Sequence, residues 1–236
     1  MSNNYFRFKQ FTIHQDGCAM KVGTDGCLLG GWFDCSHSRR ILDIGCGSGL
    51  IAIMAAQRCD AMITGIDIEK SATVQAAANV SACPWSERIE ILNTDVLQYT
   101  PQEPFDTIVC NPPYFINSLK CEESSRTLAR HSDTLECSIF FRKATTLLTE
   151  DGKISIVIPT DIAEDWKDAA ALAGFSPSRI TYIKTTPRKT PKRVLMEFIR
   201  AYRCNAETKT LILEEERGVY SKEAQEILHD FYLKLV

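Results

Sequence analysis

The 236-residue chain lacks several features that would assign it to particular classes of protein. Its ten cysteines include no CxxC pair and no metal-ligand spacing, which argues against a zinc site or a disulfide framework. No apolar run approaches the roughly 20 residues that span a membrane, and the first residues do not resemble a secretion signal. We therefore expect a soluble cytoplasmic protein with reduced cysteines, without a metal and without membrane contacts.

The chain also lacks an overall positive charge. Its net charge is -3 and its pI is near 5.9, so any nucleic-acid partner must be bound by a local patch. One stretch, residues 179–203, carries eight basic residues and a single acid, Glu197. The basic residues are Arg179, Lys184, Arg188, Lys189, Lys192, Arg193, Arg200 and Arg203.

No repeat, low-complexity tract or linker divides the chain, so we expect one domain over residues 1–236, acting as a monomer. Residues 6–22 resemble a hairpin with its turn at Asp16-Gly17. We assign residues 1–39 to this N-terminal segment, 40–203 to the core and 204–236 to an extension that ends in a helix.

Strand-like and helix-like segments alternate through the core. Strands are predicted at 40–44, 62–66, 89–92, 105–110, 153–158, 178–184 and 194–202, and helices at 50–58, 69–81, 135–148, 163–173 and 220–235. This alternation predicts an α/β fold: a mostly parallel twisted sheet with an antiparallel last strand and helices on both faces. Ligands of such sheets gather at the carboxyl ends of the strands.

A glycine-rich loop follows the first core strand. Asp43 precedes it, and Gly45, Gly47 and Gly49 allow tight turns and a close approach of a ligand to the backbone. A nicotinamide dinucleotide is one alternative, but the spacing is GxGxG rather than GxGxxG, and Asp43 would repel a pyrophosphate. A cationic ligand without phosphate, such as S-adenosylmethionine, suits the loop better.

Two further acids follow the next strands. Asp67 comes about 20 residues after the glycines, where an acid binds ribose hydroxyls, and Asp95 follows the third strand, where it can accept from an adenine amino group. Each acid taken alone is equally consistent with a turn or a helix cap. Together with the loop they resemble the nucleotide site of class I methyltransferases, which have a Rossmann-like fold.

The most specific motif is Asn111-Pro112-Pro113-Tyr114, directly after the predicted strand 105–110. The Asn111 amide oxygen and the Pro112 carbonyl can accept the two hydrogens of an exocyclic adenine amino group, and Tyr114 can stack on the base. We predict Asn111, Pro112 and Tyr114 to be catalytic, with Asn111 also bordering the cofactor. A Pro-Pro turn beside a core tyrosine is the alternative without a function.

This motif resembles that of methyltransferases acting on planar amino or amide nitrogens, which include adenine-N6 enzymes and glutamine-N5 enzymes. Four other stretches make the chain similar, nearly end to end, to the bacterial tRNA1(Val) (adenine-37-N6)-methyltransferase family. They are residues 8–11, 20–26, 129–131 and 231–232. The family more often has Val at Cys27 and Ala at Gly31, and neither departure touches the expected chemistry.

The resemblance implies a substrate, a cofactor and several roles. The cofactor would be S-adenosylmethionine and the substrate adenine-37 of tRNA1(Val). Lys21, Thr24 and Asp25 would border the methionine end of the cofactor, although an ordinary turn explains Thr24 and Asp25 nearly as well. Arg130 would contact RNA phosphate, as would His131, for which a structural role is the more common one.

The loop over residues 185–193 is the predicted RNA contact. Arg188, Lys189, Lys192 and Arg193 can neutralise phosphates there, and a solvated loop is the alternative. About 40 residues precede the first core strand, which we expect to be too few for a separate DNA-recognition domain or for the helical domain of glutamine enzymes. Methylation of another RNA, methylation of a protein glutamine, and RNA binding without catalysis remain as alternative functions.

Overall fold

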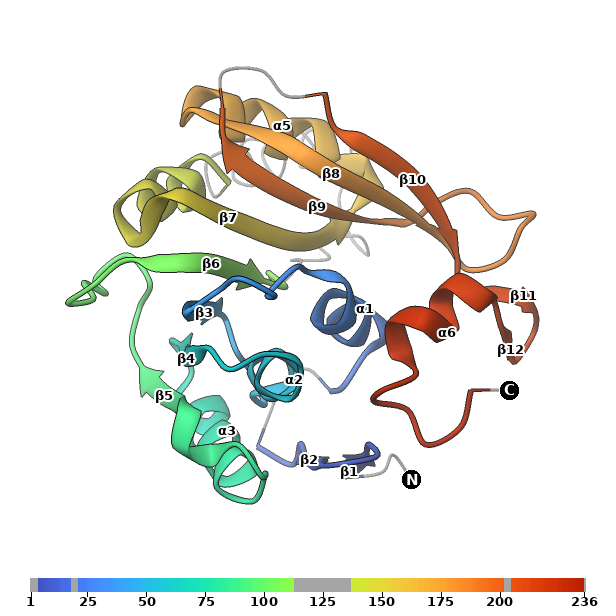
Figure 1. The fold of residues 1–236 in the computed structure, drawn as a ribbon, viewed down its shortest axis with the longest axis horizontal. Helices are drawn as coiled ribbons and strands as arrows, with labels where there is room; N and C mark the ends of the chain where they lie inside the picture. Colours follow the sequence, from blue (N-terminus) through green and yellow to red (C-terminus); the bar gives the residue numbers. More distant parts are fainter. Residues whose placement is uncertain (1–3, 18–20, 113–136, 202–204, 236) are drawn as a thin grey trace, which may run out of the picture.

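The computed structural model describes residues 4–17, 21–112, 137–201 and 205–235. One eight-stranded sheet crosses the molecule (Figure 1). Its strands are β3 (Arg40–Ile44), β4 (Met62–Asp67), β5 (Ile89–Asn93), β6 (Phe105–Cys110), β7 (Leu148–Pro159), β8 (Phe175–Lys184), β9 (Arg193–Arg200) and β10 (Glu207–Ile212). Their spatial order is β10-β8-β9-β7-β6-β3-β4-β5.

The sheet confirms the predicted topology. Strands β5, β4, β3, β6 and β7 are parallel neighbours, and β9 lies antiparallel between β7 and β8. Strand β10, which the sequence did not predict, extends the edge by pairing parallel to β8. The carboxyl ends of β3, β4 and β6 therefore meet at one edge of the sheet, where ligands of such sheets bind.

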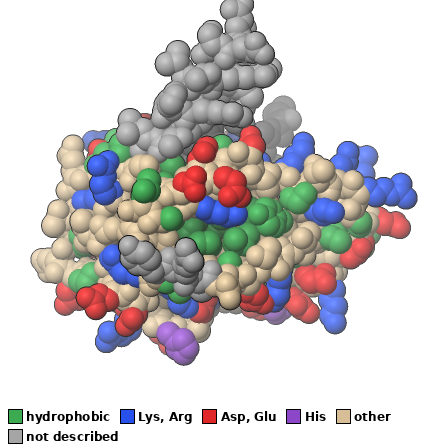
Figure 2. Space-filling view, turned by 90° about the horizontal axis from the view of Figure 1, so that it is seen from above, with side chains coloured by type: hydrophobic (Ala, Val, Ile, Leu, Met, Phe, Trp, Pro, Cys, Tyr) green, Lys and Arg blue, Asp and Glu red, His purple; other side chains and the backbone are tan. Residues whose placement is uncertain are grey.

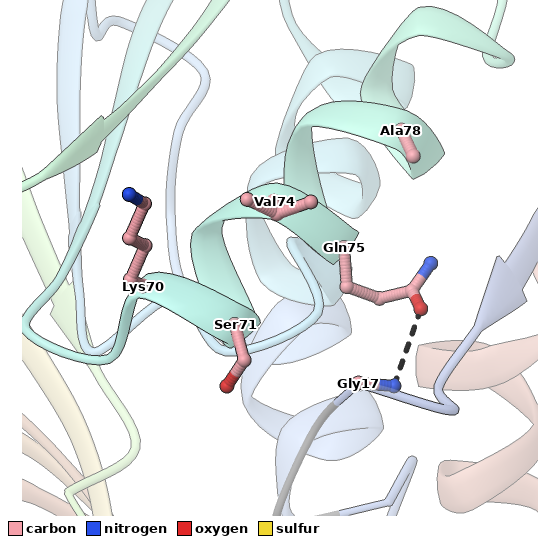
Figure 3. A pocket seen from close by; sticks show the side chains of 6 residues that line it. All are labelled: Gly17, Lys70, Ser71, Val74, Gln75 and Ala78. Atoms are coloured by element: carbon pink, nitrogen blue, oxygen red, sulfur yellow. Dashed lines mark hydrogen bonds between the residues drawn. The ribbon is translucent and has the colours of Figure 1, made fainter.

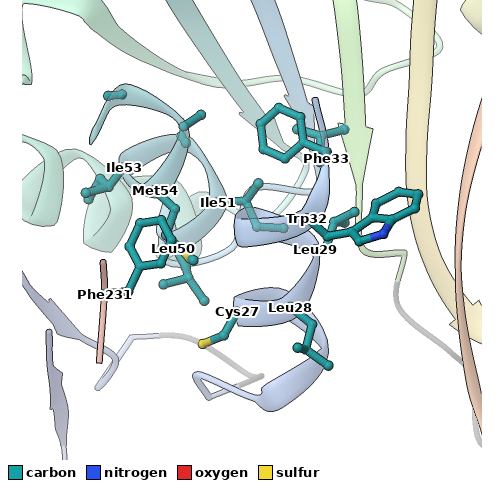
Figure 4. Packing of buried hydrophobic residues seen from close by; sticks show 14 of the residues in the cluster. Cys27, Leu28, Leu29, Trp32, Phe33, Leu50, Ile51, Ile53, Met54 and Phe231 are labelled. Atoms are coloured by element: carbon teal, nitrogen blue, oxygen red, sulfur yellow. The ribbon is translucent and has the colours of Figure 1, made fainter. Parts of the chain in front are cut away.

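Helices cover both faces of the sheet, as expected. One face carries α1 (Thr24–Trp32), α2 (Leu50–Arg58), α3 (Lys70–Ser81) and α6 (Lys222–Leu228), and the other carries the helix over residues 137–147 and α5 (Ala163–Leu172). Each face has its own buried apolar cluster, and Figure 4 shows how α1 and α2 interdigitate in the first. Among the described residues, no helix combines the length and apolarity that crossing a bilayer requires.

Helix α1 was not predicted, because its sequence gives no helical signal. The segment TDGCLLGGW contains three glycines and is buried almost all round, so neither propensity nor an amphipathic stripe marks it. Packing stabilises it instead. A Cβ at Gly30 would lie 2.6 Å from Met54 Sδ, and a Cβ at Gly31 would lie 2.5 Å from the carbonyl oxygen of Ile227, so these glycines let α1 approach both α2 and α6 closely.

The segment of β1 (Tyr5–Arg7) and β2 (Thr12–His14) lies close to the segment that follows α6 (Figure 1). Strands β1 and β2 form a hairpin that differs from the predicted one. Its turn is at Phe8–Phe11, where the Phe8 N–H donates to the Phe11 carbonyl at 2.9 Å, and not at Asp16-Gly17. The Lys9 N–H donates to the Phe231 carbonyl at 2.8 Å and so joins the hairpin to the C-terminal extension.

The C-terminal extension contains more than the predicted helix. A small hairpin of β11 (Glu214–Glu216) and β12 (Val219–Tyr220) precedes α6, which is shorter than the expected 220–235. Ser221 caps α6, because its Oγ accepts the N–H of Ala224 at 3.0 Å.

Candidate active site

The glycine loop turns as the sequence predicts. Gly45, Gly47 and Gly49 have φ values of 69°, 53° and 79°, a region that favours glycine. The N–H groups of Gly45 and Cys46 both donate to the carbonyl oxygen of Ile66, at 2.9 and 3.0 Å, which fixes the loop against the end of β4. A Cβ built at Gly45 or Gly47 meets no atom of the described residues within 4 Å, so these residues leave room for a ligand at this surface of the loop.

Asp43 is a buried carboxylate whose charge is only partly compensated. Its side chain is 1% exposed, and Oδ2 accepts the N–H of Ala52 at 3.1 Å. Oδ1 is buried and has no hydrogen-bond partner among the described residues. Burial raises the pKa of Asp43 to about 7, although the Ala52 N–H opposes that rise. A buried acceptor without a partner costs stability, so this oxygen fits a cationic ammonium group, such as that of S-adenosylmethionine.

Asp67 stands at the end of β4 beside the same loop. Its Oδ2 accepts the N–H of Gly47 and its Oδ1 accepts the N–H of Glu69, both at 2.9 Å. The carboxylate therefore orders the glycine loop and the start of α3. Each oxygen has a second lone pair, which leaves acceptor capacity for the predicted ribose contact.

Asp95 lies beyond β5 in a half-buried turn. Its Oδ1 accepts the N–H of Leu97 at 2.9 Å, and its carbonyl oxygen accepts the N–H groups of Gln98 and Tyr99 at 3.0 Å. This is the local capping role that was the alternative for each acid. A contact of Asp95 with adenine stays a prediction.

Asn111 lies next to the glycine loop and to the first turn of α1. Ile44 pairs with Cys110 in the sheet, so Asn111 leaves β6 level with Gly45. A Cβ built at Gly26 would lie 3.7 Å from Asn111 Nδ2 and 3.3 Å from Leu50 Cδ2. The first turn of α1, which contains Thr24 and Asp25, thus packs where β6 and the glycine loop end. Lys21 precedes this turn and is exposed.

Pro112 is half-buried and ends the described part of this loop. Tyr114, Arg130 and His131 lie outside the described residues, so their roles stay predictions.

An ion pair joins α1 to the last core strand. Arg193 Nε donates to Asp25 Oδ2 at 2.7 Å, and both side chains are about 30% exposed (31% and 29%). Thr160, just after β7, donates through its N–H to the Lys192 carbonyl at 3.3 Å and through Oγ1 to the Pro191 carbonyl at 3.0 Å. The start of β9 is therefore anchored on both sides.

The four RNA contacts predicted within residues 185–193 fall into two groups. Arg188, Lys189 and Lys192 are exposed in the loop between β8 and β9, whereas Arg193 is half-buried and paired. The sequence analysis grouped these four residues because they are close together in the chain. It could not show the pairing of Arg193 with Asp25, because the two residues are 168 positions apart.

Asn79 is a supporting residue that the sequence analysis did not single out. It is 1% exposed; its Nδ2 donates to the carbonyl oxygens of His14 and Ser48 at 2.8 and 2.9 Å, and its Oδ1 accepts the His14 N–H at 2.9 Å. The side chain ties β2 to the glycine loop. Its one signal in the sequence is a polar residue at a position of α3 that faces the core.

An open hollow lies on the surface between α3 and the segment after β2 (Figure 3). It is lined by Gly17, Lys70, Ser71, Val74, Gln75 and Ala78. The Gly17 N–H donates to Gln75 Oε1 at 3.3 Å across it. None of the predicted site residues that the structure describes lines this hollow, and we assign it no role.

Comparisons with known proteins identify the family of the chain. The family model of the methyltransferase small domain matches residues 19–165. The chain is 45% identical to the tRNA1(Val) (adenine(37)-N6)-methyltransferase of Parabacteroides distasonis and 46% identical to that of Phocaeicola vulgatus, with all of each chain covered. It is 41% identical to the protein of the same name from Yersinia pestis, with 97% of this chain and 93% of that one covered.

Solved structures resemble the fold at lower identity. A predicted O-methyltransferase, Atu636 from Agrobacterium tumefaciens, superposes with a TM-score of 0.71 at 20% identity, covering 90% of this chain and 99% of that one. TrmN from Thermus thermophilus superposes with a TM-score of 0.56 at 20% identity, covering 74% of this chain and 48% of that one.

The fold and the family match define a class I methyltransferase, an enzyme whose methyl donor is S-adenosylmethionine. Identity above 40% over whole chains narrows the class further. The chain belongs to the methyltransferase small domain family and, within it, to the family of tRNA1(Val) (adenine(37)-N6)-methyltransferases.

Proposed function

We propose that the enzyme transfers a methyl group from S-adenosylmethionine to the exocyclic N6 of adenine-37 in tRNA1(Val). The relatives that match it end to end carry this activity in their names. The observation that carries the proposal is the placement of Asn111 level with Gly45, in the glycine loop that directly follows Asp43, whose buried Oδ1 has no hydrogen-bond partner among the described residues. A donor held by that loop and an amino group held by Asn111 would meet at the end of β6. Action on tRNA would place the enzyme in the bacterial cytoplasm.

The cofactor would be held by side chains at the ends of three strands. Oδ1 of Asp43 would accept from the ammonium group, Asp67 would accept from the ribose hydroxyls, and Asp95 would accept from the adenine amino group. The backbone at Gly45, Gly47 and Gly49 allows close approach. Lys21, Thr24 and Asp25 border the methionine end. The bound cofactor supplies an activated methyl group on its sulfonium sulfur.

The acceptor nitrogen is oriented rather than deprotonated by the protein. The Asn111 amide oxygen and the Pro112 carbonyl accept its two hydrogens, which directs the lone pair at the methyl carbon. Bound S-adenosylmethionine would supply the methyl group and leave as the neutral thioether, and the methylated nitrogen would lose its proton to water, so no general base is required. Tyr114 would stack on the extruded base, contributing roughly 1 to 3 kcal/mol against an extrusion cost of a few kcal/mol.

The RNA backbone would be held by the loop between β8 and β9. Arg188, Lys189 and Lys192 are exposed there, at the same edge of the sheet as Asn111. The face in Figure 2 intersperses acidic and basic side chains, consistent with the net charge of -3. Binding would therefore depend on local contacts, which Arg130 would extend.

The first experiment identifies the substrate. Transfer of a labelled methyl group from S-adenosylmethionine is measured on three substrates. They are a tRNA1(Val) transcript, the same transcript with guanine at position 37, and a release-factor peptide that contains the glutamine which glutamine-N5 enzymes methylate. We expect labelling of the first RNA alone, and mass spectrometry should locate N6-methyladenosine at position 37. Labelling of the peptide would contradict the proposal. Cofactor and RNA binding without transfer would instead favour an RNA-binding protein.

The second experiment tests the basic loop. Arg188→Glu together with Lys189→Glu should weaken tRNA binding. It should also lower the salt slope, the slope of the logarithm of the binding constant against the logarithm of the salt concentration, by roughly 0.7 to 0.9 for each phosphate that is no longer neutralised. The matched control reverses two exposed charges on the C-terminal extension, Arg217→Glu and Lys222→Glu, and should keep the wild-type slope. A loop variant with wild-type affinity and slope would show that RNA docks elsewhere.

A further inference from the structure

The ion pair between Asp25 and Arg193 spans two regions that the reaction would use. Asp25 lies in the first turn of α1, one residue before Gly26, whose Cβ position is 3.7 Å from Asn111 Nδ2. Arg193 directly follows the exposed basic loop. The ion pair is short and charge-assisted, with 2.7 Å between Nε and Oδ2, and both side chains are more than two-thirds shielded from water.

The backbone of Arg193 is fixed on both sides. It pairs with Pro159 of β7 and with Ile183 of β8. The Lys192 N–H also donates to the Ile183 carbonyl at 3.2 Å. Arg193 therefore projects its guanidinium from a rigid strand end toward α1, and its charge is already matched by a carboxylate.

Helix α1 needs such a tether at its N-terminus. Gly23 occupies the N-cap position, and because it has no side chain it cannot cap the first N–H groups of the helix. Glycines at positions 26, 30 and 31 lower the helix propensity further, by about 1 kcal/mol each relative to alanine. An acid in the first turn stabilises the helix, and here a strand-borne arginine also fixes the position of that acid.

We propose that Arg193 is a positioning residue that acts through Asp25 to hold the first turn of α1 against Asn111 and the glycine loop, and that it is not a phosphate contact. Its role in placing the methionine end of the cofactor rests on the proposed function of Asp25 and Thr24. The pair then sets the geometry of the donor site from the strand that follows the RNA-binding loop.

The test measures cofactor binding without RNA, so that its outcome does not depend on the identity of the substrate. Dissociation constants for S-adenosylmethionine are measured by calorimetry for the wild type, Arg193→Ala, Asp25→Ala and the double variant. We expect Arg193→Ala to weaken binding about five- to tenfold, as for the loss of a partly shielded ion pair. In the Asp25→Ala background the same substitution should have no further effect.

Two further variants separate positioning from phosphate binding and from misfolding. Arg193→Lys, which keeps the charge, should recover most of the cofactor affinity. Lys192→Ala, the matched exposed neighbour, should lower the salt slope of tRNA binding and leave cofactor affinity unchanged. Arg193→Ala should do the reverse, keeping the wild-type slope.

Three results would overturn the proposal. One is an Arg193→Ala variant that binds the cofactor with wild-type affinity but whose salt slope for tRNA binding falls by roughly 0.7 to 0.9, the contribution of one neutralised phosphate. Another is full additivity of the two substitutions, which would mean that Arg193 does not act through Asp25. The third is a loss of cofactor affinity in Arg193→Lys as large as in Arg193→Ala. If the wild type ignores tRNA altogether, the proposed substrate fails, while the cofactor measurements still decide the role of Arg193.

Discussion

The edge of the sheet that carries the candidate site has two halves of opposite charge, a donor half at the ends of β3 and β4 and a basic half in the loop between β8 and β9. The ends of β3 and β4 present acids that are buried or already hydrogen-bonded to backbone N–H groups, as Asp43 and Asp67 are. The loop between β8 and β9 presents exposed cations with no such framework among the described residues. The first arrangement suits a small charged ligand that must be held in one pose, and the second suits a polyanion recognised by charge. The Asp25–Arg193 pair lies where the two halves meet.

The largest expected effect is a loss of turnover without a loss of cofactor affinity, which would distinguish Asn111 from the residues that bind the methyl donor. Asn111→Ala should lower kcat about a hundred- to a thousandfold, because the amide orients the nitrogen only during transfer. The dissociation constant for S-adenosylmethionine should stay within a few-fold. Single-turnover methylation together with calorimetry measures both quantities. Near wild-type turnover would remove Asn111 from the mechanism.

A second effect, the pH dependence of cofactor affinity, tests whether Asp43 binds the ammonium group of the cofactor. The pKa of Asp43 is raised from 3.8 to about 7 by burial, so its proton must leave before it can hold an ammonium group. S-adenosylmethionine affinity should therefore rise about tenfold between pH 5.5 and pH 7. Asp43→Asn should bind more weakly at pH 7 and lose this dependence; a wild-type affinity that is flat with pH would contradict the assignment.

The same pKa predicts the sign of the stability change without cofactor. The folded protein holds the Asp43 proton up to about pH 7, whereas the unfolded chain releases it near 3.8. Stability contributed by this group should therefore fall as the pH rises from about 4 to 7. Asp43→Asn should remove that slope, and thermal unfolding at several pH values measures it.

A third, smaller effect concerns the double role of Asp67. Asp67→Ala should weaken cofactor binding by roughly 1 to 3 kcal/mol, because a ribose acceptor is removed. It should also lower stability, because the N–H groups of Gly47 and Glu69 lose their acceptor. Asp60→Ala, an exposed acid before β4, is the control for both measurements. Lower stability with unchanged cofactor affinity would leave Asp67 a purely structural role.

The smallest expected effect on cofactor binding comes from a substitution in the contact between α1 and α6, away from the candidate site. Gly31→Ala places a Cβ 2.5 Å from the Ile227 carbonyl oxygen, so α6 must move. The free energy of unfolding should fall by about 1 to 3 kcal/mol, as for other overpacked cores, while cofactor affinity stays close to wild type. A large loss of affinity instead would show that the C-terminal extension shapes the donor site.

The sequence predicted the core of the fold because its signals there are local. The helix at 50–58 and the strands at 40–44 and 105–110 have the predicted bounds, since apolar periodicity and flanking glycines act within a few residues. The glycine loop and its neighbouring acids were found for the same reason. Their meeting at one edge follows from the parallel topology that alternating strands and helices imply.

Other elements carried no such signal. Helix α1 contains three glycines and is buried on nearly every side, and β10 is a mostly exposed edge strand that forms only because β8 offers a free edge. The hairpin turn was placed at Asp16-Gly17 because turn residues stand there, but the hydrogen bond of Lys9 with Phe231 favours the turn at Phe8–Phe11.

The sequence by itself thus determined the class of fold, the residue types at the strand ends and the chemistry they suit, because each depends on neighbours along the chain. Tertiary structure decided which of these residues meet. It left Asp43 Oδ1 buried without a described partner, and it turned Arg193 from an apparent member of the basic loop into the partner of Asp25. Both outcomes depend on interactions between segments far apart in sequence, which only packing of the whole chain specifies.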